Sequence, residues 1–265
     1  DYAIARALGF SLYWILPKER ARVLQHLREA FGSEKTEAEY LKIGQNAFIH
    51  LIESATDVFL FPKLNRKRLE RLVRLEEGRE RLDRALARGN GVIVLTGHLG
   101  NWELLASYFR FLGYPGSLVG RRIYYEPFNR VLVSLREKAL VSTIYRDESP
   151  HRVLAELRQN HVIGMSADQD IDSVDGIFVP FFGKMAWTPV GPAKIAWASG
   201  AAIVPAFMIH EGDGYRLFIE EPVWPPEGVL KEEAIRRVTE GWSRAVEHYI
   251  RRYPDQWVWM HRRWK

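Results

Sequence analysis

The stretch "GVIVLTGHLGNWELL" (residues 91–105) decides the fold class of this 265-residue chain. Its first six residues form a short apolar run after a glycine turn, as expected of a strand that is buried on both faces. Asn101 then provides a good N-cap, and the residues after it have the apolar spacing of a helix. A buried strand that leads directly into a helix is the repeating unit of an α/β sheet.

Downstream of this stretch, short β-branched runs alternate with helical segments. Strands are expected at "SLVG" (117–120), "STIY" (142–145), "HVIGMSA" (161–167) and "AAIVPAFMI" (201–209), with "YRLFIEE" (215–221) as an alternating edge strand. Helices are expected at residues 126–140, 149–159, 188–200 and 231–254. We therefore predict an α/β fold with a mixed, mostly parallel sheet flanked by helices.

Upstream, residues 1–89 have a helical pattern. Pro17 marks one helix start and Gly32 its end, a second helical pattern runs from residue 36 to Pro62, and a third, charged helix covers about residues 78–88. We predict one domain of residues 1–265, in which a helical N-terminal region (1–89) forms a cap or membrane-facing lobe beside an α/β core (90–265).

The composition limits the available chemistry. The chain has no cysteine, which excludes disulfides, thiolate nucleophiles and zinc bound by sulfur. The net charge of +5 favours partners that carry phosphate or carboxylate groups, such as nucleic acid, an anionic membrane or a phosphorylated substrate. The acidic run "DQDIDSVDG" (168–176) lacks the glycine and the glutamate that a calcium loop requires, and no paired-histidine spacing occurs. We expect no metal and no cofactor.

Both ends of the chain are rich in aromatic residues. "YAIARALGFSLYWIL" (2–16) is shorter than the roughly 18 residues of a spanning helix and contains Arg6, so it is either an interfacial or a core helix. Because the chain opens on Asp1 without a methionine, a preceding anchor is a further expectation. The tail "WVWMHRRWK" (257–265) is either a core strand or a membrane-interface segment. Stacking on bases needs a longer groove, so we expect no nucleic-acid partner.

His98 lies two residues beyond the first predicted strand, at the sheet edge where reactive groups collect in such folds. Glu103 follows in the first turn of the next helix. In one interpretation, the Glu103 carboxylate complements the helix dipole, and the His98 ring is a loop side chain whose hydrogen bonds go to backbone groups. In the other, a turn through Gly97 and Gly100 lets the carboxylate reach the imidazole and fix its tautomer.

The segment "HLGNWE" (98–103) resembles the H-x4-D/E signature of the glycerolipid and lipid A acyltransferase superfamily. More closely, the chain resembles the late (lauroyl and myristoyl) acyltransferases of lipid A biosynthesis. The likeness continues through "LVGRRIYYEPFN" (118–129), "GMSADQDIDSVDGIFVPFFGKMAWTPVGPAKIA" (164–196), "AAIVPAFMI" (201–209) and "DQWVWMHRRW" (255–264).

The resemblance assigns roles to individual residues. His98 and Glu103 match the catalytic pair of the family, with His98 as general base and Glu103 orienting it. The candidate substrate-binding residues are Arg121 or Arg122 in "GRR", Asp168 in "ADQD", and the helix-capping Asn101. The chain departs from its relatives after the arginine, where it has no proline and places Glu126 before Pro127.

The function that the resemblance implies is a membrane-associated O-acyltransferase. It would move a fatty acyl chain from an acyl carrier protein or coenzyme A thioester to a hydroxyl of a lipid A precursor or a similar phosphorylated glycolipid. It would act at the cytoplasmic face of the bacterial inner membrane. The alternatives are a thioesterase or lipid hydrolase that uses the same pair, an acyltransferase for another glycolipid or lysophospholipid, and a lipid-binding protein without activity. The aromatic residues Phe178, Phe181, Phe182 and Trp187 either line an acyl groove or belong to the core, and we prefer the core.

Overall fold

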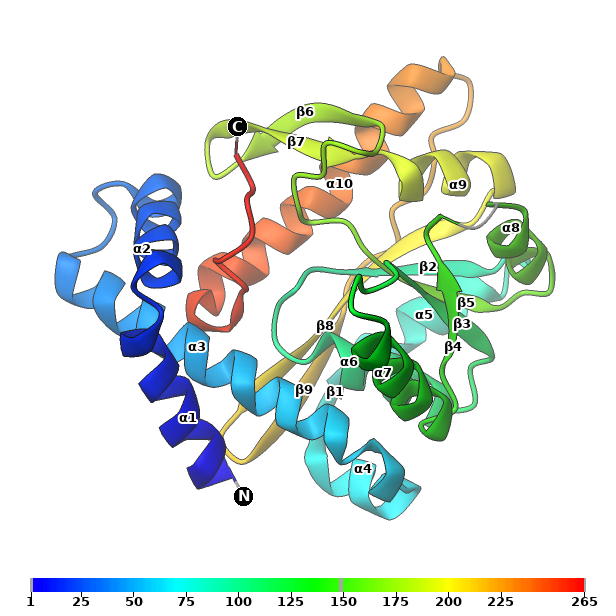
Figure 1. Cartoon of the computed structure of the whole chain (residues 1–265). Coiled ribbons are helices and arrows are strands. Elements are labelled where there is room, and N and C mark those ends of the chain that lie inside the picture. The colour runs from blue at the N-terminus through cyan, green and yellow to red at the C-terminus, as the bar shows by residue number, and fades with distance from the viewer. Residues whose placement is uncertain (1, 148–149, 265) are drawn as a thin grey trace.

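A mixed, mostly parallel sheet forms the centre of the protein, as the sequence predicts. The computed structural model describes residues 2–147 and 150–264 (Figure 1). The sheet has the strand order β1-β9-β8-β2-β5-β3-β4, and only β9 runs antiparallel to its neighbour β8. The strands are β1 (Val73–Glu77), β2 (Val92–Thr96), β3 (Gly116–Gly120), β4 (Ser142–Tyr145), β5 (Val162–Ser166), β8 (Ala202–Glu211) and β9 (Gly214–Ile219).

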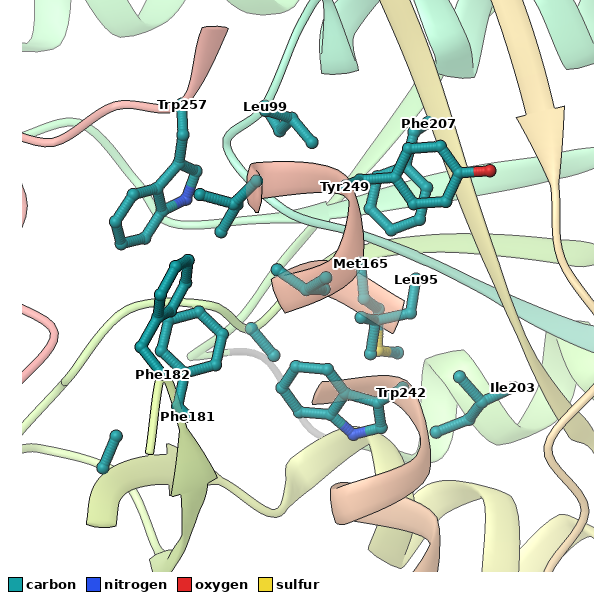
Figure 2. Close-up of a cluster of buried hydrophobic side chains, with 14 of the residues drawn as sticks. Leu95, Leu99, Met165, Phe181, Phe182, Ile203, Phe207, Trp242, Tyr249 and Trp257 are labelled. Atoms are coloured by element: carbon teal, nitrogen blue, oxygen red, sulfur yellow. The ribbon is translucent and has the colours of Figure 1, made fainter. Parts of the chain in front are cut away.

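Helices cover both faces of the sheet, since the side chains of a strand alternate between its two faces. The helices of the core are α4 (Arg66–Leu72), α5 (Arg79–Leu86), α6 (Trp102–Phe111), α7 (Glu126–Lys138), α8 (Pro150–Arg158), α9 (Gly191–Ser199) and α10 (Lys231–Arg252). On one face Val92 and Val94 of β2 join a cluster with Leu104 of α6. On the other face Leu95 belongs to the cluster that includes Trp242 of α10 (Figure 2).

A separate antiparallel hairpin extends the second cluster beyond the sheet. It consists of β6 (Gly176–Phe181) and β7 (Lys184–Pro189), and it lies against α10 (Figure 1). Phe181 and Phe182 at its turn are buried near Trp257 (Figure 2), which agrees with the preference for a core role. Phe178 is exposed and stacks edge-on against Trp187.

The N-terminal helices pack together beside the sheet. They are α1 (Tyr2–Ile15), α2 (Pro17–Phe31) and α3 (Glu37–Phe59), and η1 (Phe61–Lys63) follows. Helix α3 begins with a capping box in which Thr36 and Glu39 satisfy each other's backbone N–H groups. Helix α1 runs along α3 (Figure 1) and presents a row of exposed apolar side chains. Within the described residues, no helix combines the length and the apolar character needed to cross a membrane.

Three expectations are corrected by the structure. Residues 1–89 are not wholly helical, because Val73–Glu77 forms the edge strand β1. As β1 pairs with β9, the latter is an interior strand and not an edge strand. The tail after η2 (Pro254–Gln256) is buried but is not a strand: Trp257 makes one isolated bridge to Leu99, and the remaining residues form turns and coil.

Candidate active site

The ends of β2 and β5 bring a histidine and an aspartate together. The two strands are parallel neighbours, and their register pairs Thr96 with Ser166. His98 and Asp168 each lie two residues beyond these strand ends, so they meet at the carboxyl edge of the sheet. Oδ1 of Asp168 lies 2.7 Å from Nδ1 of His98, and Oδ2 accepts the backbone N–H of His98 at 2.7 Å. One carboxylate thus fixes both the ring and the backbone of the histidine.

Trp257 completes the surroundings of this carboxylate. Its indole Nε1–H donates to Oδ2 of Asp168 at 2.8 Å. Asp168 is 1% exposed, and burial alone would raise its pKa. The adjacent His98 ring and the three hydrogen bonds outweigh burial and hold the pKa of Asp168 well below its ordinary value. Asp168 is therefore ionised at neutral pH.

The charge of Asp168 determines the state of His98. Burial alone would lower the pKa of His98, but the charge of Asp168 and its hydrogen bond outweigh burial and raise that pKa. Nδ1 faces the Asp168 carboxylate at 2.7 Å and the side-chain amide of Gln169 at 3.1 Å. Because the carboxylate can only accept, we assign the proton of the neutral ring to Nδ1, and the Gln169 amide then turns its oxygen toward the ring. Nε2 then carries the lone pair, and it has no hydrogen-bond partner among the described residues. The His98 side chain is 24% exposed, so a substrate can reach it.

Two glycines shape the turn that carries His98. A Cβ at Gly97 would lie 3.0 Å from Oδ2 of Asp168, so a larger residue would press on the carboxylate. Gly100 has a φ of +61°, and a Cβ there would lie 2.1 Å from the carbonyl oxygen of Met208. The predicted glycine turn therefore exists, and it brings the chain against Asp168 and β8.

Glu103 has a different partner from the one that its sequence position suggested. It forms a two-point ion pair with Arg136 of α7, with Nε to Oε2 at 2.8 Å and Nη2 to Oε1 at 2.5 Å. The carboxylate that hydrogen-bonds the His98 ring is Asp168, which corrects the expected contact between Glu103 and the imidazole. Glu103 lies in the first turn of α6, so it also complements the helix dipole. A catalytic role of Glu103 stays a prediction.

The Glu103–Arg136 pair is nearly buried, which makes a testable prediction possible. The two side chains are 12% and 10% exposed. Replacing Arg136 with methionine leaves the Glu103 charge without a partner, and we expect the free energy of unfolding to fall by about 3 kcal/mol. The double variant Glu103→Gln with Arg136→Met should regain most of this loss, because no unpaired charge is left. Denaturant unfolding measures both. Equal destabilisation of the single and double variants would contradict the pairing.

The other predicted residues occupy distinct positions. Arg121 lines the groove in front of His98, whereas Arg122 lies over the ring of Tyr145 with its guanidinium carbon 4.0 Å from the ring centre. Asn101 caps α6 by accepting the N–H of Leu104, and its amide donates to Asp57. The cap is as predicted. Because Asn101 is buried and its side chain is engaged on both sides, its assignment to substrate binding stays a prediction.

A groove of about 720 Å³ opens in front of His98. Its lining combines the arginines Arg121, Arg136 and Arg146 with apolar side chains, namely Leu118, Val119, Ile144, Val153, Met165 and Ile195. None of the four aromatic residues considered as a groove lining belongs to it. A narrow apolar space of about 30 Å³, lined by residues of β2, α6, β3 and β5, shares Trp102, Leu118 and Met165 with the groove.

Sequence reasoning missed Trp257 and Arg136 as parts of this site. The tail around Trp257 was expected to be core or membrane interface, and nothing local connects it to Asp168. Arg136 has a helical position in α7 that resembles any surface arginine. Asp168, by contrast, follows the strand expected at residues 161–167, so the sequence places it at the same sheet edge as His98, although as a substrate-binding residue and not as the partner of the ring.

A protein-family comparison matches residues 2–265 to the bacterial lipid A biosynthesis acyltransferases. The chain belongs to this family. The resemblance seen in the sequence blocks is therefore confirmed.

Curated relatives with two different acceptors match the chain. A phosphatidylinositol mannoside acyltransferase of Mycobacterium tuberculosis (strain ATCC 25618 / H37Rv) is 29% identical over 213 residues, which cover 78% of this chain and 66% of the relative. The chain thus spans just under two thirds of that relative. In Escherichia coli (strain K12), a lipid A biosynthesis palmitoleoyltransferase is 28% identical over 71% of this chain and 60% of its own length. The lipid A biosynthesis lauroyltransferase of the same strain is 26% identical over 261 residues, which cover 94% of this chain and 80% of the relative.

Proposed function

We propose that the protein transfers a fatty acyl chain from a thioester to a hydroxyl group of a phosphorylated glycolipid. The observation that carries this proposal is the His98–Asp168 pair, whose histidine lines a groove with both arginine and apolar side chains in its lining. Family membership supports the same reaction class.

In the proposed reaction, Nε2 of His98 takes the proton of the acceptor hydroxyl. At the same time, the oxygen of that hydroxyl attacks the carbonyl carbon of the thioester. The new C–O bond forms, the C–S bond breaks, and the imidazolium returns the proton to the leaving sulfur. Asp168 stabilises the imidazolium between the two steps and keeps the ring in place. Atoms and charges balance without a covalent enzyme intermediate, so the absence of cysteine is no obstacle.

Arginines in the lining of the groove support binding of anionic groups. The Arg136 guanidinium is held by Glu103 and faces the same groove as Arg121. A guanidinium offers a fork of donors that matches a phosphate or a developing oxyanion. We assign the family's functional arginine to Arg121 over Arg122, because Arg122 is stacked on Tyr145.

The apolar spaces around Trp102 offer room for two sets of hydrocarbon chains. The apolar part of the groove would take the transferred acyl chain. A second apolar pocket of about 310 Å³ lies between α3 and α7 and shares Trp102, Glu103 and Leu132 with the groove. We assign this second pocket to the lipid chains of the acceptor, which must reach His98 from the membrane.

The exposed face of α1 supports access to a membrane surface. Ile4, Leu8, Phe10, Trp14 and Ile15 are all exposed on this helix. A helix of this kind lies in the interface with its apolar side toward the acyl chains. We propose that the protein works at the inner-membrane surface through α1, with acyl carrier protein or coenzyme A carrying the donor chain.

The decisive experiment supplies the purified chain with a radiolabelled acyl thioester and anionic vesicles. Two acceptors are compared, a lipid A precursor and a phosphatidylinositol mannoside, because the relatives named above act on one or the other by name. We expect acylated lipid with one of the two acceptors and little free acid in vesicles without acceptor. The same yield of free fatty acid with and without acceptor would establish a thioesterase instead. An unchanged thioester with either acceptor, together with saturable lipid binding, would indicate a binding protein without activity.

A further inference from the structure

A second cluster of titratable side chains lies away from the groove, between α3 and the end of β8. His50 and Glu53 are one turn apart on α3, and His210 is near the end of β8. Each residue offers one possible ligand atom, a ring nitrogen of the histidines or a carboxylate oxygen of the glutamate, and these three atoms all lie within 4.8 Å of one another. The sequence shows no metal motif here, because the third residue comes from a distant strand.

Glu53 is oriented into this cluster and is nearly unreachable by water. Its side chain is 1% exposed. Oε1 accepts a hydrogen bond from Nε of Arg6 at 2.7 Å, whereas Oε2 is buried without a hydrogen-bond partner. Oε2 lies 3.1 Å from Nδ1 of His50, which is also buried without a hydrogen bond. The two atoms form a buried ion pair when the His50 ring is protonated, and with a neutral ring a shared cation would satisfy both of them.

The separation of these two atoms suits a shared metal ion. Ligand atoms about 2.0–2.1 Å from a tetrahedral zinc ion are about 3.3 Å apart. Two histidines and one glutamate are a common set of protein ligands for zinc. Oε1 of Glu53 can keep its bond to Arg6, since only Oε2 is needed for the metal.

Two polar side chains of the segment η2 lie beside the two histidines of the cluster. Nε2 of His50 lies 3.7 Å from Oδ2 of Asp255, and metal-binding histidines commonly present their second nitrogen to a carboxylate. The next residue, Gln256, fixes the backbone of His210 from both sides, because it accepts the N–H at 2.9 Å and donates to the carbonyl at 2.8 Å. Asp255 and Gln256, which are consecutive residues of η2, thus lie where they can position His50 and His210 as metal ligands.

We propose that His50, Glu53 and His210 bind a divalent transition-metal ion of the zinc class, which joins the N-terminal helices to the sheet. The ion bridges α3 and β8, and its supporting residues precede Trp257, which hydrogen-bonds Asp168. The proposed site lies outside the groove, since none of its three ligands lines the groove, and a water molecule would complete its four-coordinate shell.

The test is metal binding by the purified chain after treatment with a chelator. We expect calorimetry with Zn²⁺ to give one ion per chain, and Co²⁺ to show the visible absorption of a four-coordinate site. Thermal unfolding at a hundredfold excess of Zn²⁺ over Kd should shift Tm upward by about 5 °C. No substrate is present, so the outcome is independent of the proposed acyl transfer.

Variants identify the ligands. His210→Gln should weaken Zn²⁺ binding at least about tenfold. His161→Gln is a matched control, because Nδ1 of His161 lies 3.7 Å from Glu156 without a third ligand group in the described chain. It should bind Zn²⁺ like the wild type. Equal affinity of the His210 variant and the wild type would overturn the proposal.

X-ray absorption of the zinc-loaded wild type keeps the test independent of how the variants fold. We expect imidazole scattering and nitrogen or oxygen ligands at about 2.0–2.1 Å. The absence of saturable binding, or a spectrum without imidazole, would show that the cluster is an ion-pair network with Arg6 and nothing more.

Discussion

Replacing His98 with alanine should lower kcat for acyl transfer by about 10²- to 10⁴-fold, because general base catalysis typically contributes that much. The arginines and the apolar lining of the groove and of the second pocket come from other residues, so KM for either substrate should change little. A kcat effect without a KM effect indicates an interaction made in the transition state. Steady-state kinetics with the labelled thioester and the acceptor that is found active measures both constants.

His261 provides the matched control for this variant. Its ring centre lies 5.4 Å from that of His98, so it is another histidine in the same neighbourhood. Its ring makes no hydrogen bond to Asp168, which is engaged by His98 and Trp257. His261→Ala should therefore keep kcat within a few-fold of wild type. A His98→Ala protein that retains more than a tenth of wild-type kcat would remove His98 from the role of base, and an equal loss in both variants would point to a general disturbance of the site.

The sequence predicts the position of His98 at the sheet edge but not which carboxylate contacts its ring, and the reason is physical. A buried apolar run followed by a glycine turn is a local pattern, so the position of His98 at the sheet edge follows from the residues around it. Which strand lies beside β2 is not a local property. The neighbour is β5, so the residue that contacts His98 is Asp168, 70 positions away, and not the nearby Glu103.

The same limit explains the errors in the fold. The strand β1 carries Arg74, Glu76 and Glu77, and a charged segment between two helices has no strand signature of its own. It is extended because β9 offers a free edge with which it can pair. Likewise, the tail is coil because its tryptophans fill the space between the sheet and the N-terminal helices, which no alternation in sequence reveals.

Replacing Asp168 with asparagine should lower kcat by about 10²- to 10⁴-fold, although the side chain keeps its size. In the wild type, Oδ2 accepts two hydrogen bonds, from the His98 backbone and from Trp257, and Oδ1 faces Nδ1 of His98. The single oxygen of asparagine must take the place of Oδ2, because both of its partners can only donate. The amide NH₂ then faces Nδ1, which must accept, and the proton of the neutral ring moves to Nε2. A base whose free nitrogen is protonated cannot take the acceptor's proton.

The pH profile separates this positioning role from a merely structural one. The carboxylate of Asp168 raises the pKa of His98, and only the neutral ring acts as a base. The wild-type rate should therefore fall as the pH drops through this raised pKa. In Asp168→Asn the charge is gone, so the pKa of His98 is lower. The pH at which the remaining activity falls on the acidic side should therefore be lower than in the wild type. Glu103→Gln is the matched acid-to-amide control, and its acidic limb should stay closer to the wild-type position, because the charge of Glu103 affects His98 less than that of Asp168 does. A larger shift in Glu103→Gln than in Asp168→Asn would return the orienting role to Glu103.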